Sequence, residues 1–407
     1  MRPRFHFTAP RGWINDPHGI TFRDGRYHLF FQFNPDSSIW RPDCRWGHAV
    51  SPDLFSFELL PDALLPGDGD DGIWTGSLVV DDDGAATIFY TSVTIPDVGL
   101  GRVRTARPAD DKWLTWTKGA VVVEPPAGVT AFRDPFLRRD TGTGTWQMFV
   151  GTSISGSAAA SAFVSSDLAE WRPAGVVASR AGSDRDPVWT GSLWECPQIF
   201  ELDGRDVLVT SVWEDDELYY CVYAVGRLRG GEFVAESWGR LTYGDSYYAP
   251  SYFRDADGRA CLMFWLRGIE GDGWAGAHSV PHVLRLEGER LVASPHPALE
   301  GRRAAGGIRN TVDGLGADLL WETGSRLVIT SDAQAVATVS VRGRELELVV
   351  GGSSWEMPFT GGAVRLVLDG PLIEVSVADG LVAAAIRPDG TSLAFEGDGT
   401  LCLFAVL

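Results

Sequence analysis

The stretch SPDLFSF (residues 51–57) recurs as SSDLAEW (residues 165–171), and its aromatic end recurs as KWLTW (residues 112–116). The aromatic residues that end the three copies are about 55 to 59 residues apart. A repeat of this length is typical of solenoids and propellers. A four-stranded propeller blade with its loops occupies a comparable length of chain. The repeat therefore predicts a propeller of about five blades in roughly the first 295 residues.

The segments between these copies have the composition of strands and turns. Runs rich in aromatic and β-branched residues favour strands, and four of them are YHLFFQF (27–33), TIFYTSV (87–93), WQMFVGT (146–152) and VLVTSVW (207–213). Turn sequences such as RDGR (23–26) lie between the strands. No segment shows a helical period over twelve or more residues. The sequence therefore predicts an all-β chain.

The pattern of predicted strands changes after Pro295. A loop-like stretch is followed by RLVITS, ATVSVRG, LELVVGG and VRLVLDG, which are short alternating strands with turns between them. Such a series is typical of a β-sandwich. We therefore expect a five-bladed β-propeller catalytic domain over residues 1–296 and a C-terminal β-sandwich over residues 297–407. No obvious cluster of candidate catalytic residues appears in the second of these.

The charge and the aromatic content limit the class of ligand. The chain of 407 residues has a formal net charge of −19, so we expect no nucleic-acid partner and no anionic membrane partner. Its 16 tryptophans can pack in cores or stack on ligands in a cleft. A neutral ligand such as a sugar suits this balance. The oligomeric state stays open.

The cysteines and the first residues of the chain bear on location. The five cysteines are widely spaced and form no CxxC pair, so we expect neither a zinc site nor any other metal site. Reduced thiols in a cytoplasm are the simplest explanation. The first thirteen residues, MRPRFHFTAPRGW, lack the apolar segment of a secretory signal. A cytoplasmic location is the expectation.

Five polar and aromatic positions follow the blade period. Asp16, Trp74, Asp134, Glu195 and Tyr248 are separated by about 58, 60, 61 and 53 residues. Equivalent positions of successive blades converge on the central channel of a propeller. Taken alone, GWINDPHG (residues 12–19) is a turn sequence, because Asn, Asp, Pro and Gly all favour turns. The common spacing instead predicts that three acids meet at one site.

Two carboxyl groups are what a retaining glycosidase needs, one to attack the anomeric carbon and one to protonate the leaving oxygen. A proline follows Asp16 and Asp134 directly and follows Glu195 after one residue, and it stiffens the backbone that directs each carboxyl group. We expect Arg133, beside Asp134, to keep that aspartate ionised. Singly, Asp134 could pair with Arg133 at a blade edge, and Glu195 could be a solvated strand residue.

The motifs that carry these acids resemble those of glycoside hydrolase family 32, which contains invertases, levanases, inulinases and fructosyltransferases. The similar stretches include HFTAPRGWINDPHG, FQFNP, WGHAVSPDL, FRDP and WECP, with YAPS and DGPLIEVSVADG as later ones. They extend over nearly the whole chain, and the set is far more specific than any one motif. The resemblance implies a five-bladed propeller followed by a β-sandwich, and no cofactor.

The resemblance also implies roles for individual residues. Asp16 matches the nucleophile that forms a covalent fructosyl-enzyme, Glu195 the general acid/base, and Asp134 the residue that holds fructose hydroxyls and stabilises the transition state. The positions that match the lining of the fructose pocket are Asn15, Gln32, Trp40, Trp74, Thr75 and Arg133. Tyr248 and Trp265 are further substrate-binding candidates. The two pocket tryptophans could alternatively belong to the propeller core.

Several positions depart from the family pattern and leave the substrate open. The opening motif ends in His18-Gly19 where Asn-Gly is usual, so His18 is either a structural cap or a contact of the leaving group. WTGS replaces the more usual Phe-Ser-Gly-Ser, and Gln198 follows WECP where some sucrose-cleaving members have an acid. The expected activity is release of terminal β-D-fructofuranosyl units from sucrose or short fructans by a retaining mechanism. The alternatives are a fructosyltransferase, a difructose-anhydride-type enzyme, or a non-catalytic carbohydrate-binding propeller.

Overall fold

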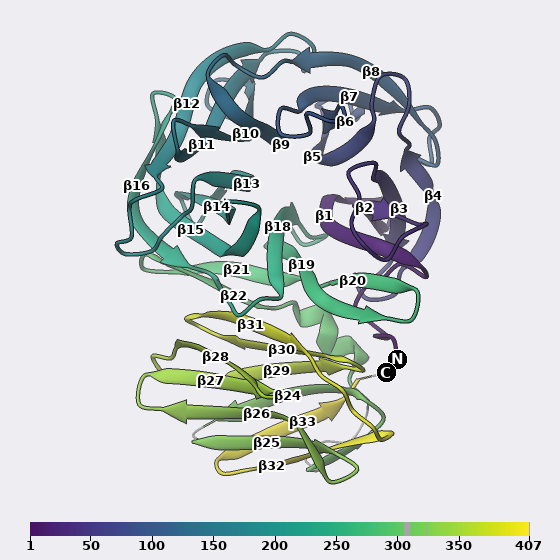
Figure 1. Cartoon of the computed structure of the whole chain (residues 1–407), viewed down its shortest axis with the longest axis vertical. Coiled ribbons are helices and arrows are strands. Elements are labelled where there is room, and N and C mark those ends of the chain that lie inside the picture. The colour runs from purple at the N-terminus through teal and green to yellow at the C-terminus, as the bar shows by residue number, and fades with distance from the viewer. Residues whose placement is uncertain (305–309, 323, 407) are drawn as a thin grey trace.

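The structure, a computed structural model, describes residues 1–304, 310–322 and 324–406. Figure 1 shows a ring of sheets and, beneath it, a second lobe of two facing sheets. This is the all-β propeller followed by a sandwich that the sequence predicts. The described part of the chain has no helix of sufficient length and apolarity to cross a membrane.

The strand pairings within residues 1–304 form five four-stranded sets, named blades I to V below. Blade I contains β1 (Gly12–Arg23), β2 (Arg26–Asn34), β3 (Arg45–Ser51) and β4 (Glu58–Leu64). Blade II contains β5 (Gly72–Val80), β6 (Ala86–Val93), β7 (Arg102–Pro108) and β8 (Trp116–Val123). Blade III contains β9 (Val129–Asp140), β10 (Thr145–Ile154), β11 (Ser157–Ser165) and β12 (Arg172–Ala181). Blade IV contains β13 (Leu193–Leu202), β14 (Arg205–Glu214), β15 (Glu217–Arg229) and β16 (Glu232–Arg240). Blade V contains β18 (Tyr247–Arg254), β19 (Ala260–Gly271), β21 (His282–Glu287) and β22 (Arg290–Pro295).

The repeated stretch that opens the sequence is the turn between the third and fourth strands of a blade. In residues 51–57, Oδ1 of Asp53 accepts the backbone N–H groups of Phe55 (2.9 Å) and Ser56 (2.7 Å). In residues 165–171, Asp167 Oδ1 accepts the corresponding N–H groups at 2.9 Å each. The leucine after each aspartate has a positive φ, 70° for Leu54 and 64° for Leu168. The same local hydrogen bonding therefore ends the third strand in blades I and III.

The ring is closed by β20 (Trp274–His278), a strand between β19 and β21 that sequence reasoning did not anticipate. It pairs antiparallel with β19 of blade V and parallel with β1 of blade I, where Trp13 lies opposite Ala275. Gly276 has a φ of +87°, and a Cβ atom there would lie 1.9 Å from the carbonyl oxygen of Ile14. Glycine is needed at this position because the two backbones approach so closely.

The second lobe consists of two six-stranded sheets. One has the order β17 (Thr242–Tyr243), β31 (Gly380–Ala385), β30 (Leu372–Val377), β29 (Val364–Asp369), β24 (Gly316–Glu322) and β33 (Thr400–Ala405). The other has the order β23 (Thr311–Asp313), β32 (Ser392–Gly397), β25 (Arg326–Ser331), β26 (Gln334–Arg342), β27 (Glu345–Val350) and β28 (Ser353–Pro358). β17 comes from the propeller part of the sequence and pairs parallel with β31, so one sheet spans the junction.

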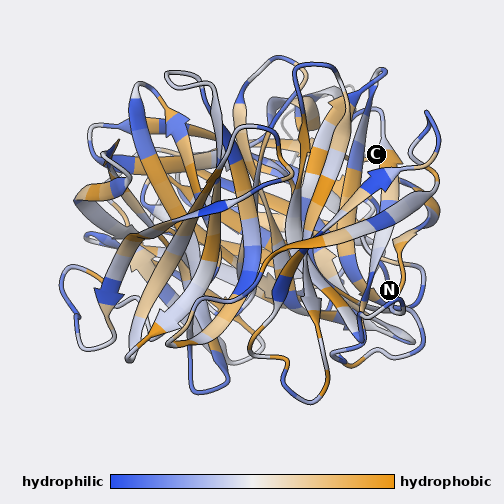
Figure 2. Ribbon diagram, turned by 90° about the horizontal axis from the view of Figure 1, so that it is seen from above, coloured by the Kyte–Doolittle hydropathy of each residue, from blue (hydrophilic) through white to orange (hydrophobic). Residues whose placement is uncertain are grey.

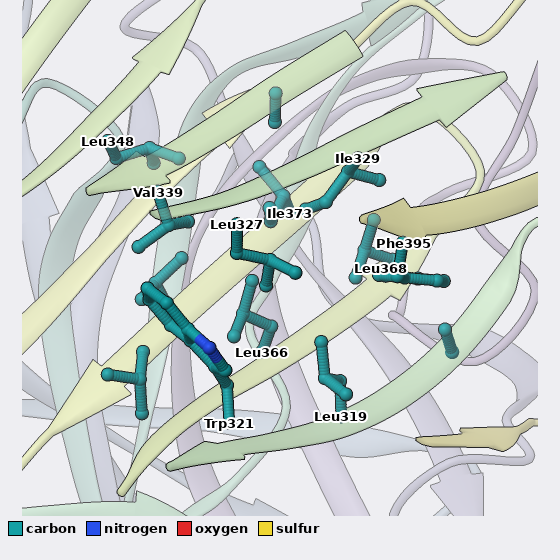
Figure 3. Packing of buried hydrophobic residues seen from close by; sticks show 14 of the residues in the cluster. Leu319, Trp321, Leu327, Ile329, Val339, Leu348, Leu366, Leu368, Ile373 and Phe395 are labelled. Atoms are coloured by element: carbon teal, nitrogen blue, oxygen red, sulfur yellow. The ribbon is translucent and has the colours of Figure 1, made fainter. Parts of the chain in front are cut away.

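The sandwich strands bury alternate residues, as β25 and β27 do. Their inward side chains form one core that includes Trp321, Leu327, Leu366 and Phe395 (Figure 3). Hydrophobic segments of the strands lie inside and hydrophilic ones at the loops (Figure 2). A short 3₁₀ helix, η1 (Pro297–Arg302), follows β22 near the predicted domain boundary. The division at residues 296 and 297 stays a prediction.

Candidate active site

The first strands of the five blades line the channel, and each carries an irregularity near its N-terminal end (Figure 1). In four of these strands, two consecutive residues lie opposite a single residue of the neighbouring strand. They are residues 15–16 of β1, 134–135 of β9, 196–197 of β13 and 249–250 of β18. In β5 the extra residue is Thr75. Bulges redirect side chains, and here they occur at the spacing seen in the sequence. The three predicted acids therefore meet at one end of the channel.

Asp16 is held by three side chains from β1, β2 and β5. Asn15 Nδ2 donates to Oδ1 (3.0 Å), while Thr75 Oγ1 (2.6 Å) and Gln32 Nε2 (3.2 Å) donate to Oδ2. Burial raises the pKa of Asp16 most; the Thr75 hydroxyl acts in the opposite direction, and nearby Glu195 adds to the rise. Three of the predicted pocket residues thus fix the orientation of the candidate nucleophile.

Asp134 lies at the bulge of β9 with a φ of +66°. Its backbone N–H donates to Thr91 Oγ1 (2.8 Å), and its Oδ2 accepts the backbone N–H of Cys196 (2.9 Å). Burial raises the pKa of Asp134 to about 8, and the carboxylates of Glu195 and Asp16 add to the rise while Arg133 opposes it. Asp134 therefore shares one site with the other two acids, whose negative charges disfavour its ionised form.

Arg133 acts on Asp134 through its charge, which lowers the pKa of that aspartate, rather than through a hydrogen bond. The guanidinium group donates instead to Glu195 Oε1, from Nε at 3.0 Å and from Nη2 at 2.8 Å. Burial and the neighbouring acids outweigh its influence on the pKa of Asp134. The backbone at the β9 bulge sends adjacent side chains in different directions, which sequence adjacency could not reveal.

Tyr248 completes the surroundings of Glu195. Its hydroxyl donates to Glu195 Oε2 (2.6 Å) and lies 3.2 Å from the carbonyl oxygen of Val212. Burial, followed by the charge of Glu195, raises the pKa of Tyr248 well above its usual value, so the phenol stays a donor. The two oxygens of Glu195 are thus oriented by different blades.

The three tryptophans predicted to bind substrate differ in exposure. Trp40 is 40% exposed, and its ring packs edge-on against Trp74 with the centroids 5.7 Å apart. Trp74 is buried and donates its indole N–H to the Pro42 carbonyl (2.9 Å). Trp265 is buried between Trp13 (5.5 Å) and Tyr248 (6.3 Å). Trp40 is therefore the exposed member of the three, and Trp74 and Trp265 are buried.

Cys196 is the site residue that sequence reasoning missed. Its Sγ lies 3.7 Å from Asp16 Oδ2 and 3.7 Å from Asp134 Oδ2, so one thiol contacts two of the acids. Burial, Asp134 and Asp16 all raise the pKa of Cys196, so it stays a neutral thiol. Its place in WECP, between Glu195 and Pro197, was the available signal.

His18 is a structural residue in this fold. Its side chain is buried, and its ring lies on that of Trp46 with the centroids 3.8 Å apart. Burial lowers the pKa of His18 well below its usual value. A buried neutral imidazole stacked on tryptophan favours the structural alternative for His18.

Among the described residues, one group of three has the ligand types and spacing of a metal site, namely Asp255 and Cys261 in blade V and His296, the residue before η1. His296 Nδ1 accepts the backbone N–H of Ala298 (3.1 Å), so its Nε2 carries the proton and donates to Asp255 Oδ2 (2.9 Å). Arg259 Nε donates to the same oxygen (2.5 Å). Asp255 is thus hydrogen-bonded to protein side chains, and the cluster lies outside the site of the three acids.

Comparison with known proteins identifies the family. The model described as the N-terminal domain of glycosyl hydrolases family 32 matches residues 6–295. The chain belongs to glycoside hydrolase family 32. The matched segment contains all three acids and every predicted pocket residue, so the resemblance inferred from the motifs is confirmed at the level of the family.

Curated relatives of this family 32 chain include several sugar hydrolases. A sucrose-6-phosphate hydrolase of Zymomonas mobilis subsp. mobilis is 31% identical over 339 residues, which are 76% of this chain and 65% of the relative. One of Bacillus subtilis is 32% identical over 331 residues, 74% of this chain and 66% of the relative. A fructan 6-exohydrolase of Beta vulgaris is 26% identical over 337 residues, 72% of this chain and 54% of the relative. The chain spans less than two thirds of the length of these relatives.

Solved structures of family 32 share the fold. A β-fructofuranosidase of Bombyx mori has a TM-score of 0.86 and 24% identity, covering 100% of this chain and 93% of that one. Fructan 1-exohydrolase IIa of Cichorium intybus, solved with 1-kestose, has a TM-score of 0.84 and 20% identity, covering 100% and 97%. At these identities the likeness concerns the fold alone.

Proposed function

We propose that this chain is a retaining β-fructofuranosidase that releases terminal β-D-fructofuranosyl units from sucrose or short fructans. The observation that carries the proposal is the unequal environment of two carboxyl groups at one site. Asp16 is fixed by three donors at the channel, and Glu195 is oriented by Arg133 and Tyr248 with its side chain 18% exposed. This difference supports attack by Asp16 and proton exchange between Glu195 and a leaving group or water.

In the first step a carboxylate oxygen of Asp16 attacks C2 of the fructosyl ring. The bond from C2 to the leaving oxygen breaks, its electron pair goes to that oxygen, and Glu195 donates the proton. The product is a fructosyl ester on Asp16 and a free leaving sugar. Asp134, which carries a fixed hydrogen bond from Cys196, is the group that holds fructose hydroxyls during this step.

The contacts of Tyr248 suit both protonation states of Glu195. When Glu195 is ionised, the phenol donates to its Oε2. When Glu195 is protonated, the phenol proton can turn to the carbonyl oxygen of Val212, 3.2 Å away. In the second step Glu195 takes a proton from water, the water oxygen bonds to C2, and Asp16 leaves as a carboxylate. Glu195 ends protonated, ready for the next turnover.

The roles can be tested with paired substitutions and two substrates. Asp16→Asn should almost abolish turnover of sucrose, and Glu195→Gln should slow it by about 10²–10⁴-fold, because general acid catalysis is typically worth that much. With β-D-fructofuranosyl fluoride, whose leaving group needs no proton, Glu195→Gln should still form the fructosyl-enzyme, and azide should accelerate its breakdown. Asp83→Asn, at an exposed turn between β5 and β6, is a matched control.

Two outcomes would contradict the assignment. If azide rescued Asp16→Asn and left Glu195→Gln unaffected, the two roles would be reversed. If wild-type protein cleaved neither substrate, the chain would not be a fructosidase. Product analysis at high sucrose separates hydrolysis from fructosyl transfer, because transfer yields trisaccharides in place of free fructose.

We also infer that the protein works in a reducing compartment such as the cytoplasm. All five cysteines, Cys44, Cys196, Cys221, Cys261 and Cys402, are free, and four of them are buried. Disulfides are typical of oxidising compartments. Titration of the denatured, unreduced protein should find five reactive thiols, and a smaller number would count against this location.

A further inference from the structure

The position of Glu195 determines where the leaving sugar has to lie. A general acid donates directly to the leaving oxygen, so it must be within hydrogen-bond reach of it. Arg133 occupies Oε1 of Glu195 and Tyr248 contacts Oε2. The leaving sugar therefore has to contact the groups that surround this end of Glu195 on blade IV and its neighbours.

Trp213 is the aromatic residue beside this position. It lies in β14, where it pairs with Leu193 of β13, and Ser211, two residues earlier, pairs with Glu195. The Arg133 guanidinium, which holds Glu195, lies 5.8 Å from the centroid of the Trp213 ring. Trp213 is only half-buried. A half-exposed indole at the edge of a sugar site offers an apolar surface to the C–H face of a sugar.

The segment after Trp213 is attached to the same site. Arg267 donates to the carbonyl oxygens of Leu218 (2.8 Å) and Tyr219 (2.9 Å), and its guanidinium lies 5.0 Å from the centroid of the Tyr248 ring. Tyr248 in turn donates to Glu195. The hairpin between β14 and β15 is therefore anchored beside the candidate general acid rather than projecting freely from the blade.

The tip of this hairpin is acidic. Residues 214–217 read EDDE, and Asp215 and Asp216 are exposed, with positive φ angles of 52° and 63°. Proteins bind phosphate with arginine, lysine or the N-terminus of a helix. Arg133 and Arg267 are already occupied by Glu195 and by backbone carbonyls. η1 is the one helix in the described residues, and it lies after blade V. Like charges beside a cleft repel an anionic ligand.

We propose that Trp213 is the platform on which the leaving sugar stacks and that the acidic turn after it makes this subsite selective for uncharged sugars. The proposal rests on the proposed function. It separates this chain from its relatives named sucrose-6-phosphate hydrolase, because a phosphate on the leaving sugar would face Glu214, Asp215, Asp216 and Glu217.

The platform is tested by two substrates that share fructose and differ in the leaving group. In Trp213→Ala, kcat/KM for sucrose should fall by about 3–10-fold, as expected for loss of one aromatic contact. For β-D-fructofuranosyl fluoride, which has no leaving sugar, kcat/KM should change by less than about twofold on the same grounds. Trp213→Phe, which keeps a ring, should recover most of the loss. Trp171→Ala, at the repeated turn of blade III, is the matched control and should not alter the ratio of the two constants.

Equal losses with sucrose and the fluoride in Trp213→Ala would overturn the platform, because a merely structural role affects both. If Trp213→Ala failed to fold, Trp213→Phe would be the test. The platform then requires that Trp213→Phe change kcat/KM for sucrose more than kcat/KM for the fluoride. If wild-type protein cleaved the fluoride but not sucrose or any fructan, the inference would fail while a fructosyl-transferring site remained. If it cleaved neither substrate, the proposed function would fail as well.

The charge selectivity is tested with sucrose and sucrose phosphorylated on glucose. At about 0.01 M salt, where the Debye length is near 30 Å, kcat/KM should be at least about tenfold lower for the phosphorylated sugar. At about 1 M salt, with a Debye length near 3 Å, the gap should narrow at least threefold. At low salt, the double substitution Asp215→Asn with Asp216→Asn should reduce the difference in kcat/KM between the two sugars. Asp82→Asn with Asp83→Asn, at an exposed turn of blade II, removes the same charge and should leave the difference in kcat/KM between the two sugars unchanged.

A preference for the phosphorylated sugar at low salt would overturn the selectivity. So would a selective loss of activity on that sugar in Arg185→Gln. Arg185 lies 4.6 Å from the ring centroid of Trp189, a residue that contacts Tyr219. That loss would mean that Arg185 binds the phosphate.

Discussion

Substitution of His6 by glutamine should destabilise the protein in a way that depends on pH. His6 lies in the N-terminal segment and contacts two carboxylates of the sandwich, Asp369 Oδ2 from Nδ1 (2.9 Å) and Glu374 Oε1 from Nε2 (2.6 Å). All three side chains are buried. Because each ring nitrogen faces a carboxylate, the imidazolium form satisfies both contacts. His6 therefore joins the propeller to the sandwich as a cation.

The pKa of His6 gives the magnitude. Burial alone would lower it, but the hydrogen bonds and charges of Asp369 and Glu374 outweigh burial and raise the pKa of His6 from 6.5 to about 9. At about 1.4 kcal/mol per pKa unit, this corresponds to roughly 3 kcal/mol of stability. Since the folded-state value is the higher one, this contribution is fully present below pH 6.5. It is lost as pH rises through about 9.

His282, Tyr247 and Glu374, which belong to the same network, do not produce this dependence of stability on pH. Glu374 also accepts a hydrogen bond from the Tyr247 hydroxyl and lies 3.5 Å from His282 Nε2. Burial lowers the pKa of His282 to about 4 and raises that of Tyr247 well above its usual value. Burial alone would raise the pKa of Glu374, but His6, His282 and Tyr247 together lower it. Among His6, His282, Tyr247 and Glu374, the group with a pKa near 9 is thus His6.

The assay is urea unfolding of the wild type and His6→Gln at pH 6 and pH 10. The loss of unfolding free energy should be about 3 kcal/mol at pH 6 and less than about 1 kcal/mol at pH 10. His296→Gln is the control, since burial lowers the pKa of His296 and its cost should not shrink between these pH values. A cost for His6→Gln that is as large at pH 10 as at pH 6 would refute the reasoning.

Three further substitutions test the fold and the site. Gly276→Ala should destabilise the ring and reduce activity, because its Cβ would displace Ile14 in the strand that carries the candidate nucleophile; thermal unfolding and kcat/KM measure both effects. Asp134→Asn should weaken fructose binding and slow turnover with every leaving group, and calorimetry with fructose would disprove this by showing unchanged affinity. Trp321→Ala should cost about 3–5 kcal/mol, because Trp321 is fully buried in the sandwich core, and urea unfolding measures this loss.

The sequence by itself determined the architecture and brought the three candidate acids to one site. The turn of residues 51–57 returns at residues 165–171 because the same aspartate side chain binds nearby backbone N–H groups. Strands such as β2 and β6 follow from continuous apolar runs. These signals act over a few residues, so they are legible in one sequence. The blade period, which is also a property of the sequence, is sufficient to place Asp16, Asp134 and Glu195 at one site.

Only the tertiary structure decided which partner each of these groups has. Arg133 contacts Glu195 rather than its neighbour Asp134, because the bulge of β9 separates the directions of adjacent side chains. Cys196 contacts two acids that lie 62 and 180 residues away, and His6 is tied to Asp369 across 363 residues. Contacts over such separations depend on strand register and on ring closure by β20, which are set by packing of the whole chain rather than by any local pattern.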